Sequence, residues 1–106
     1  LVTPDIRAAL DVRDEGCVFP GCDKPPSACE AHHILPWWAH GHTELANLVL
    51  LCPHHHGIIE PSHNPTADRW QVRLPANGPA HVIPPRRVDP KQTPRIHNRF
   101  TAPMRT

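Results

Sequence analysis

Two short pairs of metal-binding residue types constrain this chain of 106 residues more than any other feature. Cys17 and Cys22 are separated by four residues, and Cys52 and His55 are separated by two. Zinc takes four ligands in a tetrahedron, and each short spacing supplies two of them from one turn. With 39% hydrophobic residues and 15 prolines, the chain can form only a small core. Folds with small cores commonly need a disulfide or a bound metal for stability. We therefore predict a structural Zn²⁺ bound by these four residues.

Disulfides and inert buried cysteines are the alternatives. Disulfides form in oxidising compartments, and the first residues show no basic leader followed by an apolar run, so we expect a cytoplasmic protein. The absence of an initial Met leaves open that the chain is a fragment of a longer one. Cys29 is expected to pack in the core, and His54 is the alternative to His55 as fourth ligand.

Local patterns predict a small α+β fold. Thr3-Pro4-Asp5 begins a helix with a capping hydroxyl and a proline in the first turn. In chain order we expect a helix from Pro4 that ends near Gly16, antiparallel strands at 29–35 and 47–51, a helix between Pro53 and Pro61, and a hairpin that joins 70–74 to 81–83.

Charge is divided unevenly along the chain. Residues 1–60 have a net charge of −5 and residues 61–106 a net charge of +6, within a total of +1. We divide the chain into a domain at 1–83 and a proline-rich, loosely ordered basic tail at 84–106. Basic side chains neutralise DNA phosphates, so this tail is a candidate for nucleic-acid binding through Arg86, Arg87, Lys91 and Arg95.

A second group of candidate ligands lies outside the zinc set. His56 and Glu60 are four positions apart in the predicted helix and so share one face. Together with His32 they offer a site for a divalent cation, while His33 remains free to accept a proton. Neighbouring strand residues point to opposite sides, so His32 and His33 need different roles or a local distortion to serve one site.

The order His32-His33-Ile34, Asn47-Leu48 and Cys52-x-x-His55-His56 resembles the HNH, or ββα-metal, endonucleases. The Cys17–Cys22 and Cys52–His55 pairs resemble the zinc-bound subclass. A similar arrangement occurs in the HNH domain at the C-terminus of certain bacterial repeat-family proteins. The resemblance covers about residues 10–75. It implies a zinc-stapled, treble-clef-like ββα core with an N-terminal helix, a C-terminal hairpin and a basic tail.

The resemblance also implies roles for individual residues. His33 matches the general base, His32 and His56 match ligands of the catalytic cation, and Asn47 matches the residue that braces the loop beside the base. Glu30 matches an acidic position next to the site. The position four after His56 is often His or Asn in the family, whereas Glu60 here favours a hard cation such as Mg²⁺ or Mn²⁺.

The implied activity is metal-dependent hydrolysis of DNA phosphodiester bonds, by an HNH nuclease or nickase, to 5′-phosphate and 3′-hydroxyl ends. The alternative is a zinc-stabilised DNA-binding module whose second metal site has decayed. We expect DNA as the partner, no membrane association, no small-molecule cofactor, and a monomer or weak dimer.

The remaining aromatic residues and histidines are assigned structural or surface positions. Trp37 and Trp38 are expected to cover the small core, and Trp70 to pack inside it. Five histidines without paired spacing are expected at the surface, namely His40, His42, His63, His81 and His97.

Overall fold

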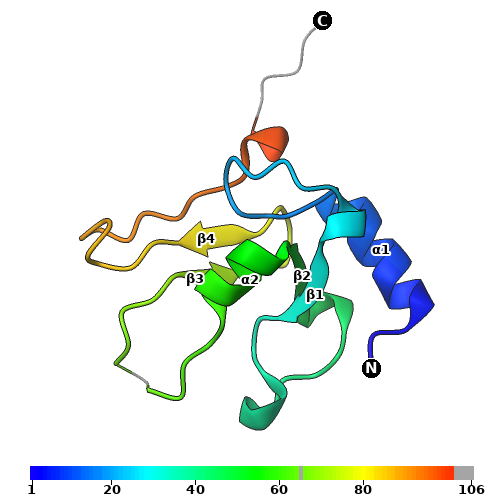
Figure 1. Cartoon of the computed structure of the whole chain (residues 1–106), viewed down its shortest axis with the longest axis horizontal. Helices are drawn as coiled ribbons and strands as arrows, with labels where there is room; N and C mark the ends of the chain where they lie inside the picture. The colour runs from blue at the N-terminus through cyan, green and yellow to red at the C-terminus, as the bar shows by residue number, and fades with distance from the viewer. Residues whose placement is uncertain (65, 102–106) are drawn as a thin grey trace, which may run out of the picture.

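The structure, a computed structural model, describes residues 1–64 and 66–101. Over these residues it contains two α-helices and two separate two-stranded antiparallel sheets (Figure 1). The elements follow one another as α1 (Pro4–Asp14), β1 (Glu30–His33), β2 (Leu48–Leu51), α2 (Pro53–Ile59), β3 (Gln71–Arg73) and β4 (His81–Ile83). This order confirms the predicted small α+β fold, with an N-terminal helix, a ββα core and a hairpin after it.

Helix α1 begins and ends at local signals. The Thr3 hydroxyl accepts a 3.2 Å hydrogen bond from the backbone N–H of Ile6, as expected for a capping residue. At the other end Glu15, with φ of 61°, takes the left-handed conformation that closes the helix. Gly16 follows with φ of 144°, and a Cβ there would lie 2.5 Å from the Lys24 carbonyl oxygen. The helix ends at Asp14, close to the predicted end near Gly16, and the glycine allows the chain to pass close to the loop that contains Lys24.

A buried carboxylate ties α1 to β2. Asp14 is almost fully buried, and its Oδ2 accepts a 2.9 Å hydrogen bond from the backbone N–H of Leu50. Arg13 donates to Asp14 Oδ1 at 2.7 Å and to the Leu45 carbonyl oxygen at 2.8 Å. These bonds compensate the charge of Asp14 inside the protein and make α1 an integral part of the core.

Strands β1 and β2 form the centre of the molecule. They pair antiparallel, with Glu30 opposite Leu51 and His33 opposite Leu48. All four residues of β2 are fully buried, and both α1 and α2 contact this strand. β2 is shorter than predicted because Asn47 ends a 3₁₀ turn, Leu45–Asn47, instead of starting the strand.

Residues 84–101 pack against the rest of the chain. Pro84 and Pro85 are fully buried, and Arg95 pairs with Val82 through two backbone hydrogen bonds of 2.8 Å. The expectation of a loose tail is wrong for these residues, because buried proline rings and backbone pairing order a segment whose composition is typical of a linker. The remainder of the proposed tail, residues 102–106, lies outside the described residues. The domain boundary at residue 84 stays a prediction.

Within the described residues, no helix has the length and apolar character needed to span a lipid bilayer.

Candidate metal centres

Four side chains converge where the loop after α1 meets the start of α2. Cys52 is the N-cap residue of α2, and His55 lies in its first turn. Of all the described histidine, cysteine, aspartate and glutamate side chains, only Cys17, Cys22, Cys52 and His55 bring three or more ligand atoms within 4.8 Å of one another. The structure thus brings together the predicted zinc set.

The distances within this set suit tetrahedral zinc. Cys22 Sγ lies 3.9 Å from Cys52 Sγ, and His55 Nδ1 lies 3.5 Å from Cys17 Sγ and 3.2 Å from Cys52 Sγ. Tetrahedral angles and Zn–S bonds of about 2.3 Å separate two sulfur ligands by roughly 3.8 Å. These three separations are compatible with one ion bound between the four side chains.

No disulfide competes with this assignment. All four cysteines are free thiols, and the 3.9 Å between Cys22 and Cys52 far exceeds the length of about 2.05 Å of a disulfide bond. Cys29 is buried outside the set, and its thiol donates to the Pro25 carbonyl oxygen at 3.2 Å, in agreement with a packing role. His54 is exposed and is not part of the converging group.

Burial without a cation works against ionised ligands. Burial raises the pKa of the Cys17 thiol to about 12. Burial also opposes ionisation of Cys52, but the backbone N–H of His55 and the thiols of Cys17 and Cys22 outweigh it and lower the pKa of Cys52. Burial, followed by the charge of His54, lowers the pKa of His55, which keeps its imidazole neutral with a lone pair for a metal. A cation bound here would supply the positive charge that the thiolates of Cys17, Cys22 and Cys52 require.

Aromatic rings cover the histidine of this site. Phe19 stacks on His55, with ring centroids 4.0 Å apart and planes within 3°. Trp70 lies against Phe19 at 5.0 Å, and the Arg95 guanidinium sits 5.6 Å from the centre of the Trp70 ring. Trp70 was predicted to lie in the core. It is half-buried and packs through Phe19 against the loop that carries Cys17 and Cys22, which we call the zinc knuckle.

The C-terminal segment also holds the zinc knuckle. Arg99 donates to the carbonyl oxygens of Asp14 at 2.9 Å, Cys17 at 3.0 Å and Cys22 at 3.3 Å. His97, only 5% exposed, contacts the Cys22 carbonyl oxygen through Nε2 at 2.7 Å. The expected surface position of His97 is therefore wrong. Its contact lies 75 positions away in sequence, so no local pattern could have revealed it.

The second histidine cluster lies between β1 and α2. His32 and His56 face each other with ring centroids 4.9 Å apart and planes at 80°. His56 Nδ1 lies 3.4 Å from a carboxylate oxygen of Glu30, and its Nε2 lies 3.3 Å from one of Glu60. Glu30 and His32 share one side of β1 because strand residues two apart face the same way. Four of the residues singled out from sequence thus lie in one cluster.

His32 is the unusual member of this cluster. Its side chain is 3% exposed, and Nε2 is buried without a hydrogen-bond partner. Burial, followed by the nearby His56 and His33, lowers its pKa to about 4, so the ring is neutral at pH 7. A buried, unpartnered imidazole nitrogen costs stability unless something binds it, and a divalent cation fits this requirement. The ligand atoms of His32, His56 and Glu60 are less tightly grouped than the zinc set.

His33 points to a different neighbour, the loop between β1 and β2. Its Nε2 lies 2.9 Å from the hydroxyl of Thr43. Asn47 fastens the same loop, since its amide accepts from Leu35 N–H and donates to the carbonyl oxygens of Leu35 and His42, all at 2.9 Å. Gly41 closes against Leu35 so tightly that a Cβ would lie 1.7 Å from its carbonyl oxygen. Asn47 and Gly41 therefore hold the loop beside His33 in a defined conformation.

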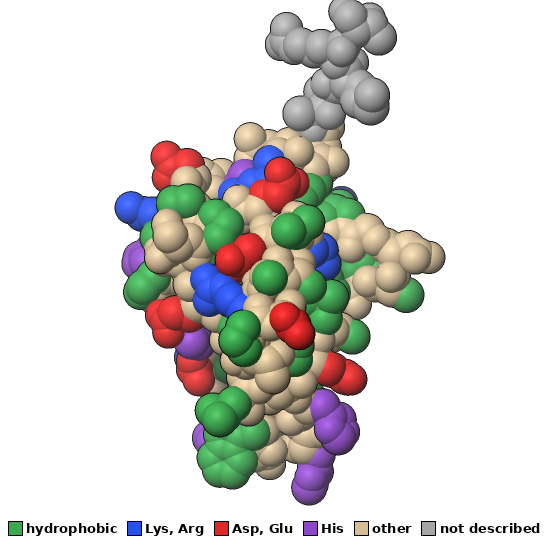
Figure 2. Space-filling model, turned by 90° about the vertical axis from the view of Figure 1, so that its right-hand side faces the viewer, with side chains coloured by type: hydrophobic (Ala, Val, Ile, Leu, Met, Phe, Trp, Pro, Cys, Tyr) green, Lys and Arg blue, Asp and Glu red, His purple; other side chains and the backbone are tan. Residues whose placement is uncertain are grey.

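The four basic residues proposed to bind nucleic acid are exposed. Their segment is anchored at Asp68, whose carboxylate accepts from the backbone N–H of Arg86 at 2.7 Å and of Arg87 at 3.0 Å. These two hydrogen bonds lower the pKa of Asp68. On the α1 side of the molecule, shown in Figure 2, basic side chains are scattered among acidic and hydrophobic ones. That face offers no continuous basic surface.

Two tryptophans depart from the expected core positions. Trp37 is 80% exposed and Trp38 is 38% exposed. They lie in a 3₁₀ turn, Trp37–Ala39, that projects from the loop after β1. Trp38 stacks on His63, with centroids 3.8 Å apart and planes within 23°. The expectation that both cover the core is wrong, because Trp37 is largely exposed and Trp38 is partly exposed and packs on His63 instead of joining the buried cluster.

The fold and its converging cysteines and histidines define a small ββα domain with a candidate metal centre. Residues 15–61 match the family model of the HNH endonucleases, which confirms the resemblance inferred from the sequence. Over these residues the chain matches an HNH domain, and the Cys/His set is consistent with the zinc-bound form of that domain.

Relatives extend the similarity to the flanking elements. The uncharacterized protein Rv1148c of Mycobacterium tuberculosis is 34% identical over 105 residues, which is 99% of this chain and 21% of that protein. The uncharacterized protein Rv1128c of the same organism is 38% identical over 97 residues, 92% of this chain and 20% of that protein. The chain thus spans about a fifth of the length of these relatives. No solved structure matches significantly.

Proposed function

We propose that this domain is a metal-dependent DNA endonuclease that hydrolyses phosphodiester bonds. The observation that carries the proposal is the buried, unpartnered Nε2 of His32 beside His56, whose ring lies between two carboxylates. Neutral imidazoles and carboxylates are suitable ligands for a divalent cation that keeps several waters. The match of residues 15–61 to the HNH endonucleases supports the same chemistry.

The proposed ligands of the cation are His32, His56 and Glu60, with Glu30 oriented toward His56. Mg²⁺ or Mn²⁺ in this position would stabilise the negative charge that develops on the phosphate and the departing sugar oxygen. Glu60 favours such hard cations. Structural Zn²⁺ in the separate Cys/His set would hold the start of α2, and with it His56, in place.

His33 is the proposed general base. Its contact with the Thr43 hydroxyl fixes one ring nitrogen and leaves the other to accept a proton from the attacking water. Asn47 keeps the adjoining loop in shape through its three hydrogen bonds. Transfer of this proton would generate the hydroxide that attacks phosphorus. The bond from phosphorus to the 3′ oxygen breaks, and this oxygen takes a proton from solvent water, which gives a 3′-hydroxyl and leaves the phosphate on the 5′ end.

Conversion of supercoiled plasmid to relaxed circles is the direct test. The zinc-loaded protein is incubated with plasmid, with and without added Mg²⁺ or Mn²⁺. Relaxed circles that form only with the added cation support an endonuclease. Intact plasmid and intact single-stranded DNA under all conditions, with a folded, zinc-loaded protein, would rule out the activity.

One observation favours a second candidate, a zinc-stabilised DNA-binding module without catalysis. Both ring nitrogens of His56 already face carboxylates, Glu30 and Glu60, and this arrangement can stand without a cation. Retention of DNA by a protein that never nicks it would favour this candidate.

A further inference from the structure

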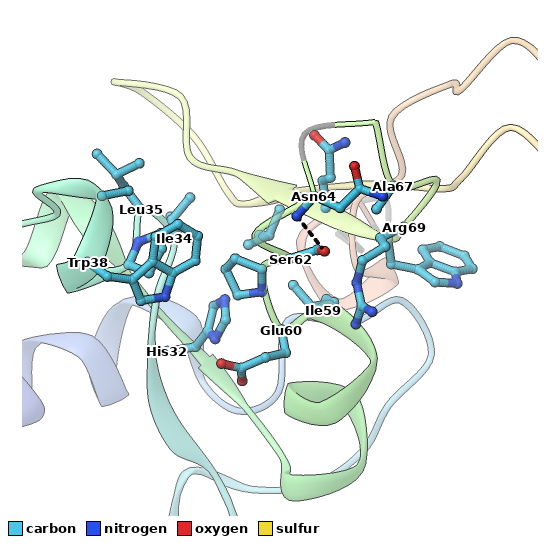
Figure 3. Close-up of a pocket in the computed structure, with 16 residues that line it drawn as sticks. His32, Ile34, Leu35, Trp38, Ile59, Glu60, Ser62, Asn64, Ala67 and Arg69 are labelled. Atoms are coloured by element: carbon cyan, nitrogen blue, oxygen red, sulfur yellow. Dashed lines mark hydrogen bonds between the residues drawn. The ribbon is translucent and has the colours of Figure 1, made fainter.

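A cavity of about 400 Å³ opens beside the second histidine cluster. One wall comes from β1 and the loop after it, and the other from the end of α2 and the segment that leads into β3 (Figure 3). Figure 3 shows His32 and Glu60 pointing toward each other at one side of this space, with Trp38 nearby on the β1 side. Pockets of roughly 300–1,000 Å³ suit groups the size of small molecules.

The position of the cavity limits what it can hold. His32 and Glu60 belong both to its lining and to the proposed cation site. A phosphate bound at that cation would therefore lie at the mouth of the cavity. The occupant that fits is a group covalently joined to the phosphate, which in DNA means the adjoining nucleoside. This step rests on the proposed function.

Trp38 provides a flat apolar surface in the wall of this cavity. Its indole stacks on His63, so its orientation is fixed before any ligand binds. A preorganised ring loses little conformational freedom on binding, and every nucleobase has a face that can stack on it. Trp37, its exposed neighbour, does not line the cavity.

The rest of the lining suits a base more than a purely apolar group. Ile34, Ile59 and Val72 provide apolar walls, while Ser62, Asn64 and Gln71 bring a few hydrogen-bonding groups. Small-molecule sites share this combination of apolar walls and few polar groups. Arg69 adds a positive charge to the lining, which complements the phosphates that flank a bound base.

We propose that this cavity binds one unstacked nucleobase of the DNA strand, next to the phosphate to be cleaved. A base inside a duplex is stacked on both faces, so it enters only from single-stranded or locally opened DNA. The domain would therefore prefer single strands, ends and distorted duplexes over regular duplex DNA.

Two oligonucleotides with equal charge test the proposal. A short thymidine oligonucleotide and an abasic strand of the same length carry the same phosphates and differ only in their bases. Binding is measured by fluorescence anisotropy with zinc-loaded protein and no added Mg²⁺ or Mn²⁺. We expect roughly tenfold tighter binding of the strand with bases. Equal affinities for the two strands would overturn the proposal.

Substitution of neighbouring tryptophans locates the effect. Trp38→Ala should remove most of the preference for bases, Trp38→Phe should restore part of it, and Trp37→Ala should leave it intact because Trp37 lies outside the cavity. Thermal unfolding of each variant checks that the fold persists. Equal losses of the preference in Trp37→Ala and Trp38→Ala, or a preference that survives in Trp38→Ala, would contradict the assignment. If Trp38→Ala does not fold, Trp38→Phe takes its place: its preference for bases should be weaker than that of Trp37→Ala, and equal preferences in these two variants would contradict the assignment.

The plasmid assay separates the two proposals. If the wild-type protein nicks plasmid but binds the thymidine and abasic strands equally, the endonuclease proposal stands and the base-binding cavity is refuted. Discrimination without nicking would leave a base-binding module and refute the catalysis. Neither nicking nor binding would refute both.

Discussion

His32 and His56 meet edge to face, with ring centroids 4.9 Å apart, although one comes from the central hairpin and the other from the helix that follows it. This contact joins β1 to α2 at the proposed cation site. Cys52 and His55 belong to the first turn of α2, so an ion bound by the zinc set would fix this helix independently. Two metal sites would thus share one short helix, with His55 and His56 as adjacent ligands of different ions.

Replacement of His33 by Ala should abolish plasmid nicking without loss of zinc or of the fold. His33 is the proposed base and lies outside both ligand sets, with its Nε2 against Thr43. General bases contribute about 10²–10⁴-fold to rate, so nicking should fall by at least about a hundredfold. His42→Ala is a matched control, because the side chain of His42 is exposed. Wild-type rates in a folded His33→Ala protein would refute the role.

Cys17→Ser should act on folding rather than on chemistry. Structural zinc supplies about 10–16 kcal/mol of apparent binding energy in zinc-finger peptides, which is comparable to the whole stability of a small domain. We therefore expect loss of cooperative thermal unfolding and of bound zinc. Cys29→Ser, at a buried cysteine outside the set, should retain its zinc. A Cys17→Ser protein that melts like wild type with one zinc per chain would refute the site.

Glu60 should control which metal supports cleavage. Its carboxylate lies 3.3 Å from His56 and favours hard cations. Glu60→Ala should raise the Mg²⁺ or Mn²⁺ concentration needed for half-maximal nicking, and Glu60→His should shift the preference toward Ni²⁺ or Zn²⁺. Metal titrations of the nicking rate measure both effects. Unchanged metal profiles in both variants would exclude Glu60 as a ligand.

Stability should depend on pH through His32. Burial lowers its folded pKa to about 4, below the ordinary value near 6.5, so the unfolded chain binds the proton more readily. Its neutral form contributes stability fully above about pH 6.5, and this contribution is lost as pH falls toward 4, by about 3 kcal/mol at most. Urea unfolding at pH 7 and pH 5 should show a smaller loss in His32→Leu than in wild type. Equal losses would contradict a buried neutral His32.

The basic segment should be tested by substitution rather than truncation. Removal of residues after Pro85 would also remove His97 and Arg99, which bond to the zinc knuckle, so DNA binding and folding would change together. Replacement of the exposed Arg86, Arg87 and Lys91 by Gln should instead weaken DNA binding and reduce the slope of log affinity against log salt by up to about 0.9 per phosphate contact. Unchanged affinity and slope, measured by anisotropy, would exclude this surface.

Local signals predicted most of the fold. Thr3 and Pro4 marked the start of α1, the prolines at 53 and 61 bounded α2, and alternation around residue 72 indicated the second hairpin. The zinc set followed from spacing because both halves are local pairs whose geometry a turn determines. Each of these inferences depends on residues a few positions apart.

Long-range contacts account for what the sequence did not reveal. Arg99 and His97 reach carbonyl groups more than 70 positions away, and backbone acceptors leave no mark in the side-chain pattern. The exposure of Trp37 and Trp38 depends on how a loop leaves the sheet, a matter of tertiary geometry. The sequence also did not predict which of His32 and His33 is buried. Alternation along β1 places their side chains on opposite faces, but it does not indicate which face α2 covers.

The bond from Arg99 to Cys17 has a consequence for biosynthesis. Its two ends lie 82 positions apart, and a ribosome delivers the chain from the N-terminus at about 5–20 residues per second. The cysteine loop and the first turn of α2 emerge early and can capture zinc several seconds before Arg99 appears. During that interval the Cys17 and Cys22 carbonyl groups remain open to water. A nascent domain that still lacks Arg99 should therefore exchange bound metal with chelators faster than one in which this hydrogen bond has formed.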